Sequence, residues 1–68
     1  MLESVKWFPM CCAEHAAYAE ERTKDGGMAR IKRRIAGDFD VMRFNAQNVR
    51  VDAEYVVMTE AQVAELLR

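Results

Sequence analysis

The chain has few of the residues that staple or interrupt a small fold: 2 cysteines, 1 histidine, 1 proline and 3 glycines among 68 residues. Its cysteines, Cys11 and Cys12, are adjacent, and neighbouring cysteines are badly placed for an unstrained disulfide. Free thiols are typical of the reducing cytoplasm. No apolar run approaches the roughly 18 residues that span a bilayer, and Glu3 interrupts the segment where a signal peptide would need apolar residues. The sequence predicts a cytoplasmic protein without membrane segments.

Charge is abundant but unevenly distributed. Hydrophobic residues make up 51% of the chain and charged residues 31%, which is typical of a folded domain, and the length allows one compact domain over residues 1–68. Residues 22–50 carry eight basic side chains against three aspartates, whereas residues 1–21 and 51–68 are acidic. Because the net charge is only −1, attraction to nucleic acid would have to come from a local basic patch.

The N-terminal half of the chain predicts a helix. Residues 10–24 are rich in Ala, Glu and Arg and contain neither Gly nor Pro. Pro9 suits the first turn of a helix, and Gly26-Gly27 suits its end. Residues 28–35 fit either a helix or a strand, and we favour the strand because a third strand would support an otherwise marginal hairpin.

The C-terminal half predicts two strands and a second helix. Residues 39–44 form one expected strand, a loop follows at 45–48, and residues 49–58 alternate apolar with polar side chains as a half-buried strand does. Thr59 and Gln62 have the spacing of a capping box that opens a last helix, with Val63 on its apolar face. We therefore expect a small α+β domain with an N-terminal helix, a two- or three-stranded antiparallel sheet and a short C-terminal helix.

Three residues with metal-binding side chains, Cys11, Cys12 and His15, lie close together in the sequence. The spacing Met10-x-Cys12-x-x-His15 resembles the Met-x-Cys-x-x-Cys loop of small heavy-metal-binding domains, and this resemblance implies soft-metal binding as one alternative function. A structural zinc site needs four ligands, however, and the cluster supplies three. Free cysteine is more commonly a packed, unreactive residue. We therefore predict no metal or other cofactor and interpret the stretch as the start of the helix.

Recognisable catalytic patterns are missing from the sequence. A cysteine at a helix N-terminus has the chemistry of a nucleophile, with His15 as its base. No orienting acid or oxyanion hole follows at a recognisable spacing, and glycine-rich phosphate loops and paired-carboxylate motifs do not occur. We expect no catalytic residues and no enzymatic activity.

A basic run in the middle of the chain is the strongest binding feature. If residues 28–35 are a strand, three of its basic side chains project from one face toward phosphates or an acidic protein. The expected helix-strands-helix order resembles a double-stranded-RNA-binding domain, which implies nucleic-acid binding as a second alternative. That family places lysines at the start of its last helix, where this chain has Glu60. The candidate residues are Arg30, Lys32, Arg33 and Arg34, with Arg43 beside them.

Large apolar side chains are more numerous than one small core needs, so some should be exposed or covered by a partner. Trp7 and Phe8, beside Pro9, are the candidates for exposure, because aromatic and arginine side chains dominate interface hot spots. We expect a non-enzymatic protein that binds a larger host or phage protein as an inhibitor or accessory subunit. Small chains without motifs are often phage or mobile-element products, anti-CRISPR inhibitors among them. A homodimer is also expected, because a core this small needs a further staple.

Overall fold

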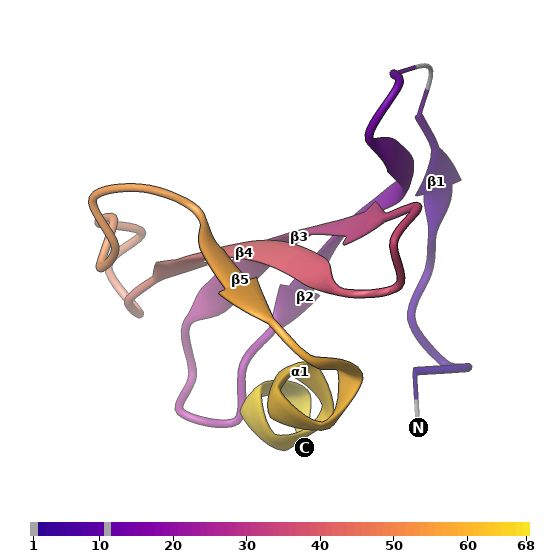
Figure 1. Cartoon of the computed structure of the whole chain (residues 1–68). Coiled ribbons are helices and arrows are strands. Elements are labelled where there is room, and N and C mark those ends of the chain that lie inside the picture. Colours follow the sequence, from indigo (N-terminus) through magenta and orange to yellow (C-terminus); the bar gives the residue numbers. More distant parts are fainter. Residues whose placement is uncertain (1, 11) are drawn as a thin grey trace.

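The computed structural model of the protein describes residues 2–10 and 12–68. Five strands precede a single helix in this part of the chain (Figure 1). Each strand pairs antiparallel with its neighbour in sequence, so the sheet order is β1-β2-β3-β4-β5. The elements are β1 (Phe8–Pro9), β2 (His15–Arg22), β3 (Met28–Arg34), β4 (Phe39–Phe44), β5 (Val56–Met58) and α1 (Glu60–Leu67).

The predicted N-terminal helix is wrong, and so is the two- or three-stranded sheet. Residues 15–22 form β2, which pairs with β3 along most of its length. Ala17 and Ala19 are buried on one side of β2, while Tyr18 and Glu20 project from the other. Helix propensity is a weak preference that tertiary pairing overrides, and alanine is small enough to be buried in a closely packed strand. Pro9 lies in the edge strand β1 rather than in a first helical turn.

The two central strands match the sequence-based expectation. The interpretation of residues 28–35 as a strand is confirmed by β3, and the strand predicted at 39–44 is confirmed by β4. The long strand predicted at 49–58 is wrong, because only residues 56–58 form β5 and Arg50 makes a single bridge to Phe44. Residues 45–55 instead leave the sheet as a loop (Figure 1).

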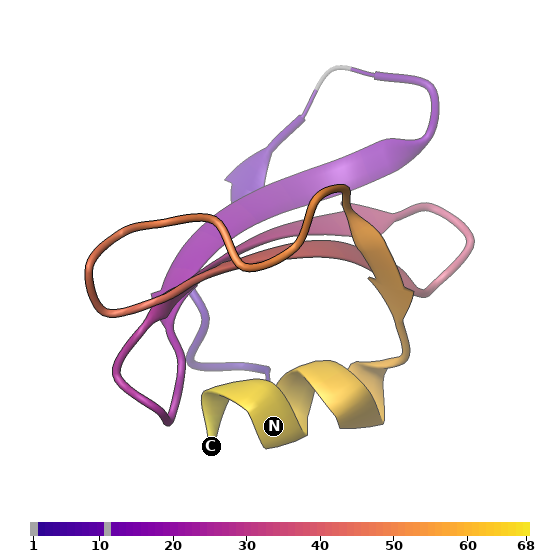
Figure 2. The same cartoon turned by 90° about the vertical axis from the view of Figure 1, so that its left-hand side faces the viewer.

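One face of the sheet is covered by α1, which lies beneath it in Figure 2. The helix begins at the predicted capping box: the Thr59 hydroxyl accepts from the Gln62 amide at 3.2 Å, and the Gln62 side chain accepts from the Thr59 amide at 2.8 Å. Val63 is completely buried against the sheet. The core cluster consists of Leu2, Val5, Ala19, Ala29, Ile31, Phe39, Val41 and Val63.

No helix within the described residues has the length and apolar character needed to cross a bilayer.

Candidate functional site

The face of the sheet opposite α1 is the first candidate site, and we call it the outer face. Cross-strand partners project from the same side of a sheet, so the register defines a row of side chains that crosses all five strands. At the ends of this row, Phe8 and Val57 are 51% and 53% exposed. The row runs through Phe8, Tyr18, Lys32, Asp40 and Val57.

Basic side chains lie over aromatic rings on the outer face. The Arg30 guanidinium lies 5.1 Å from the centre of the Phe44 ring, and the Lys32 ammonium lies 4.5 Å from the centre of the Tyr55 ring. Such contacts between a cation and a ring are attractive and hold both partners in place. Arg30 also forms an ion pair with Glu20 at 3.4 Å. The face therefore presents cations that contact aromatic rings.

Glu20 also accepts a hydrogen bond from the Tyr18 hydroxyl. Burial, followed by this carboxylate, raises the pKa of Tyr18 to about 12. The hydroxyl consequently stays protonated and remains a hydrogen-bond donor throughout the physiological pH range.

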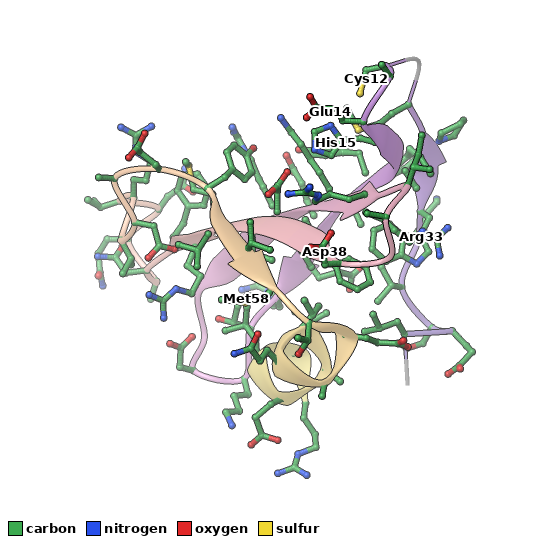
Figure 3. All side chains as sticks on the ribbon, in the orientation of Figure 1. Cys12, Glu14, His15, Arg33, Asp38 and Met58 are labelled. Atoms are coloured by element: carbon green, nitrogen blue, oxygen red, sulfur yellow. The ribbon has the colours of Figure 1, made fainter. Side chains whose placement is uncertain are left out.

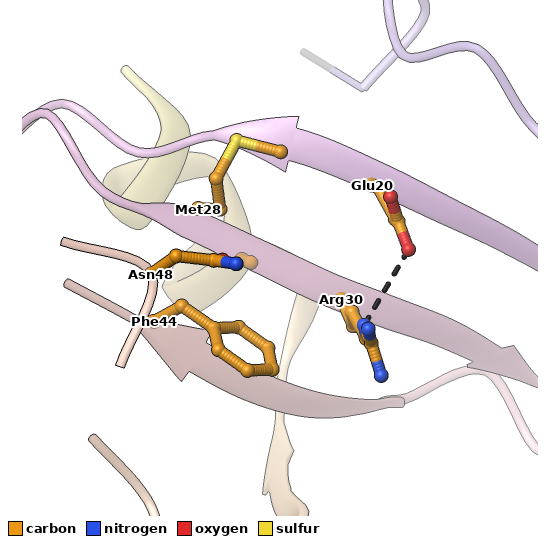
Figure 4. Close-up of a pocket in the computed structure, with 6 residues that line it drawn as sticks. Glu20, Met28, Arg30, Phe44 and Asn48 are labelled. Atoms are coloured by element: carbon orange, nitrogen blue, oxygen red, sulfur yellow. Dashed lines mark ion pairs between the residues drawn. The ribbon is translucent and has the colours of Figure 1, made fainter. Parts of the chain in front are cut away.

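A shallow hollow of about 170 Å³ opens beside the Arg30–Glu20 pair (Figure 4). Met28, Phe44 and Asn48 form its other walls. Pockets for drug-sized ligands typically measure about 300–1,000 Å³. The hollow is therefore too small for such a ligand and has the size that suits a single protruding side chain.

The predicted basic residues do not form one patch. Arg30, Lys32 and Arg34 project from the outer face, whereas Arg33 lies on the opposite side with its guanidinium 4.9 Å from the centre of the Trp7 ring. Arg43 also lies on the side of α1, where it donates two hydrogen bonds to Asp52, at 3.0 and 2.8 Å. Strand alternation thus divides the run between the two faces.

The two predicted aromatic anchors also separate. Phe8 lies on the outer face, where the Lys6 ammonium is 5.7 Å from its ring centre. Trp7 is only partly exposed and stacks on Phe39 of the core, with 6.0 Å between ring centres. Of the two, Phe8 is the more accessible to a partner.

A second candidate site lies at the end of the sheet where the β1–β2 loop meets β2, at the top of Figure 3. The Cys12 sulfur is 3.2 Å from His15 Nδ1, and His15 Nε2 is 2.7 Å from Asp40 Oδ2. Hydrogen bonds from the backbone at Glu14 and from the His15 side chain lower the pKa of the Cys12 thiol. The bond to Asp40, and then the bond to Cys12, raises the pKa of His15.

This arrangement does not converge on a metal ion. Cys12 and Asp40 bind opposite nitrogens of the His15 ring, so the three side chains do not face one common point. Among residues 2–10 and 12–68 no three His, Cys, Asp or Glu side chains are placed to hold a metal. Cys11, the remaining member of the predicted metal cluster, lies outside the described residues.

Sequence reasoning counted Tyr18, Phe44 and Tyr55 among the surplus aromatics but did not assign them to the binding surface, and it missed Asp40 beside His15. A signal for Tyr18 was present, since it alternates with Ala17 and Ala19 in the period of a strand. Asp40 is 25 residues from His15, and only the register of β2, β3 and β4 brings the two together.

In comparisons with protein-family models, with curated proteins and with solved structures, nothing matches the chain.

Proposed function

We propose that the chain is a non-catalytic binding protein that docks on an acidic surface of a larger protein through its outer face, as an inhibitor or accessory subunit. The observation that carries this proposal is the row from Phe8 to Val57, which crosses five strands, is not covered by α1, and ends in two side chains that are more than half exposed. Rigid aromatic groups beside cations are typical of interface anchors.

The charge of the outer face favours an acidic partner. Lys32 and Lys6 contact aromatic rings and form no ion pair within the described residues. Their positive charges are therefore available to carboxylates of a partner, while the rings beneath them supply apolar contact area. Electrostatic complementarity of this kind mainly raises the association rate and selects against wrong partners.

Nucleic-acid binding has weaker support from the same residues. Arg30 is paired with Glu20, Arg34 with Asp38 at 2.9 Å, and the Arg43 guanidinium with Asp52. Each phosphate contact at these arginines would compete with a carboxylate already in place. A groove that follows a phosphate backbone needs several cations that are not already paired with carboxylates. On the outer face both Arg30 and Arg34 are already paired in this way.

The test is a capture experiment with three baits: the wild type, Lys32→Glu and Arg68→Glu. Arg68→Glu is the matched control, because it makes the same change of charge on a side chain that is 76% exposed at the end of the chain, away from the outer face. A protein partner should bind the wild type and the control in equal molar amounts and be lost from Lys32→Glu. Its affinity for the wild type should fall as salt is raised.

A second variant, Phe8→Ala, tests the apolar part of the same surface. We expect it to weaken binding of the recovered partner without changing the far-ultraviolet circular dichroism spectrum, since Phe8 is exposed. Binding of that partner to Lys32→Glu and Phe8→Ala as tightly as to the wild type would exclude the outer face. Recovery of nucleic acid alone would instead support the alternative function.

A further inference from the structure

We infer that Cys12, His15 and Asp40 form a thiol–imidazole–carboxylate relay that makes Cys12 a reactive nucleophile toward small disulfides such as glutathione disulfide. This inference goes beyond the proposed function and does not depend on it. The relay joins residues of the β1–β2 loop, β2 and β4. Figure 3 labels its first two members, Cys12 and His15. Nucleophile, base and orienting group stand in hydrogen-bond contact in that order, which is the arrangement that activates thiols in proteins.

A β-bulge places His15 in the relay. The register between β2 and β3 shifts between His15 and Ala17, so that Ala17 is paired with Arg33 but His15 with Arg34. Without the shift, His15 would share the side of Ala17 and face α1, because residues two apart in a strand project from one face. The shift turns His15 to the outer face, where Asp40 lies. Bulges commonly re-aim a side chain in this way.

The surroundings favour the charged forms of the pair, a Cys12 thiolate and a His15 imidazolium. When Cys12 is a thiolate and His15 an imidazolium, Nδ1–H donates to the sulfur and Nε2–H donates to Asp40. Asp40 is in turn held by Arg34, whose Nη1 is 3.8 Å from its other oxygen. Other charged groups nearby are Glu14 in the loop and Asp38, which is paired with Arg34.

Exposure differs between the reacting atom and its base. The His15 side chain is only 15% exposed and the Asp40 side chain 19%, whereas Cys12 is an exposed free cysteine. The imidazole is thus shielded and fixed, while the sulfur remains open to a reagent. Reactive cysteines sit in such accessible sites next to a cation, whereas structural cysteines are buried.

The reaction is a thiol–disulfide exchange. The Cys12 thiolate attacks one sulfur of the small disulfide, a new S–S bond forms, and the old S–S bond breaks. The second sulfur leaves as a thiolate with the bonding electron pair and takes up the proton that His15 received from Cys12. The disulfide is the oxidant, and the products are a mixed disulfide on Cys12 and one free small thiol.

The first test measures alkylation by iodoacetamide against pH in a Cys11→Ser chain, where Cys12 is the only thiol. We expect its rate to reach half-maximum at a lower pH than the rate of the same chain unfolded in urea. His15→Gln in that background should lower the rate at pH 7 several-fold, and Asp40→Asn by less. A Cys11→Ser, Cys12→Ser chain, which has no thiol, is the control and should give only the background rate.

The second test substitutes no residue of the relay and changes it only by modification of Cys12. The chain has one histidine, so His15 gives a single imidazole signal whose titration is followed by nuclear magnetic resonance. Conversion of Cys12 to its mixed disulfide with glutathione should lower the pKa of His15, because the thiolate partner is lost. Equal alkylation profiles in folded and unfolded chains, or an unchanged titration of His15 after modification, would overturn the inference.

Discussion

Replacement of Gly27 by Ala should destabilise the fold far more than replacement of its neighbour Gly26. Gly27 lies in the turn between β2 and β3, where its amide donates to Thr23 Oγ1 and to Asp25 Oδ1, both at 3.1 Å. A Cβ at position 27 would overlap the backbone carbonyl oxygen of Phe44 and would lie 3.3 Å from Thr23 Oγ1. Phe44 belongs to β4 and pairs with Met28 of β3.

The cost follows from what must move. The atom that a Cβ at position 27 would meet is a backbone carbonyl oxygen of Phe44, which cannot rotate away as a side chain can. To make room, β4 would have to move away from β3 at Phe44, near the buried Ala29. Forced overlap of this kind belongs among the large destabilising effects, and we expect a loss of at least about 3 kcal/mol in the free energy of unfolding. Cores of this size supply about 3–5 kcal/mol in total. The Gly27→Ala chain should therefore retain at most about 2 kcal/mol and unfold at a much lower urea concentration than the wild type.

Gly26→Ala is the matched control. Gly26 has φ +93°, and a Cβ added there would meet no atom within 4 Å, so the change costs only the strain of a left-handed backbone, about 1–2 kcal/mol. Urea unfolding followed by circular dichroism and by the fluorescence of Trp7, the one tryptophan, measures both variants. Equal midpoints for the two variants would refute the close approach of Gly27 to β4.

Three further predictions concern other parts of the fold. Thr59→Ala removes the hydroxyl that accepts from Gln62 and should lower the free energy of unfolding by about 1 kcal/mol in urea titrations, whereas Thr59→Ser should keep most of it. The bond from Arg43 lowers the pKa of Asp52. The stability that Asp52 contributes is therefore present above the pKa of about 3.9 that it has in the unfolded chain, and it is lost as the pH falls through the pKa of the folded chain. In urea titrations, Asp52→Asn should be less stable than the wild type at pH 7, and the difference should shrink in acid. We also expect a dimer at high micromolar concentration in sedimentation experiments. It would form through the edge strand β5, where Val57 is 53% exposed. Val57→Lys should sediment as a monomer, and a wild type that sediments as a monomer at every concentration would contradict the pairing.

The parts of the fold that sequence reasoning predicted correctly are those with local signals. The capping box at Thr59 and Gln62 needs only residues three apart, and β4 is bounded by turn residues at both ends. The N-terminal helix was wrongly predicted because alanine suits a helix interior and a closely packed strand equally well by size. The segment forms a strand because β2 pairs with β3, and this pairing cannot be detected in a short window of the sequence.

The strand predicted at 49–58 failed for a related reason. Val49 and Val51 alternate with polar residues, yet they are 57% and 54% exposed. The alternation of apolar and polar residues therefore did not indicate a buried face. Asp52 accepts hydrogen bonds from both the backbone and the guanidinium of Arg43. Residue 52 is thus held by Arg43 of β4 through its side chain and not through a strand ladder, and alternation alone cannot reveal such a contact.

The relay could not have been found by spacing, even though all three residue types were visible in the sequence. His15 and Ala17 would share a face in a regular strand, which would direct His15 toward α1 and away from Asp40. The bulge between them reverses that outcome, and no residue in the segment His-Ala-Ala marks a bulge in the way that glycine or proline would. The same irregularity lets a single sheet face carry two chemistries: aromatic and basic side chains along its regular register, and a thiol held by imidazole where the register breaks. Deletion of Ala16 should straighten β2 and leave His15 opposite Arg34, on the outer face beside Asp40, because successive residues of a regular strand project from opposite faces. Cys12 should then keep its reactivity, and a fall to the reactivity of the unfolded chain would contradict this account of the bulge.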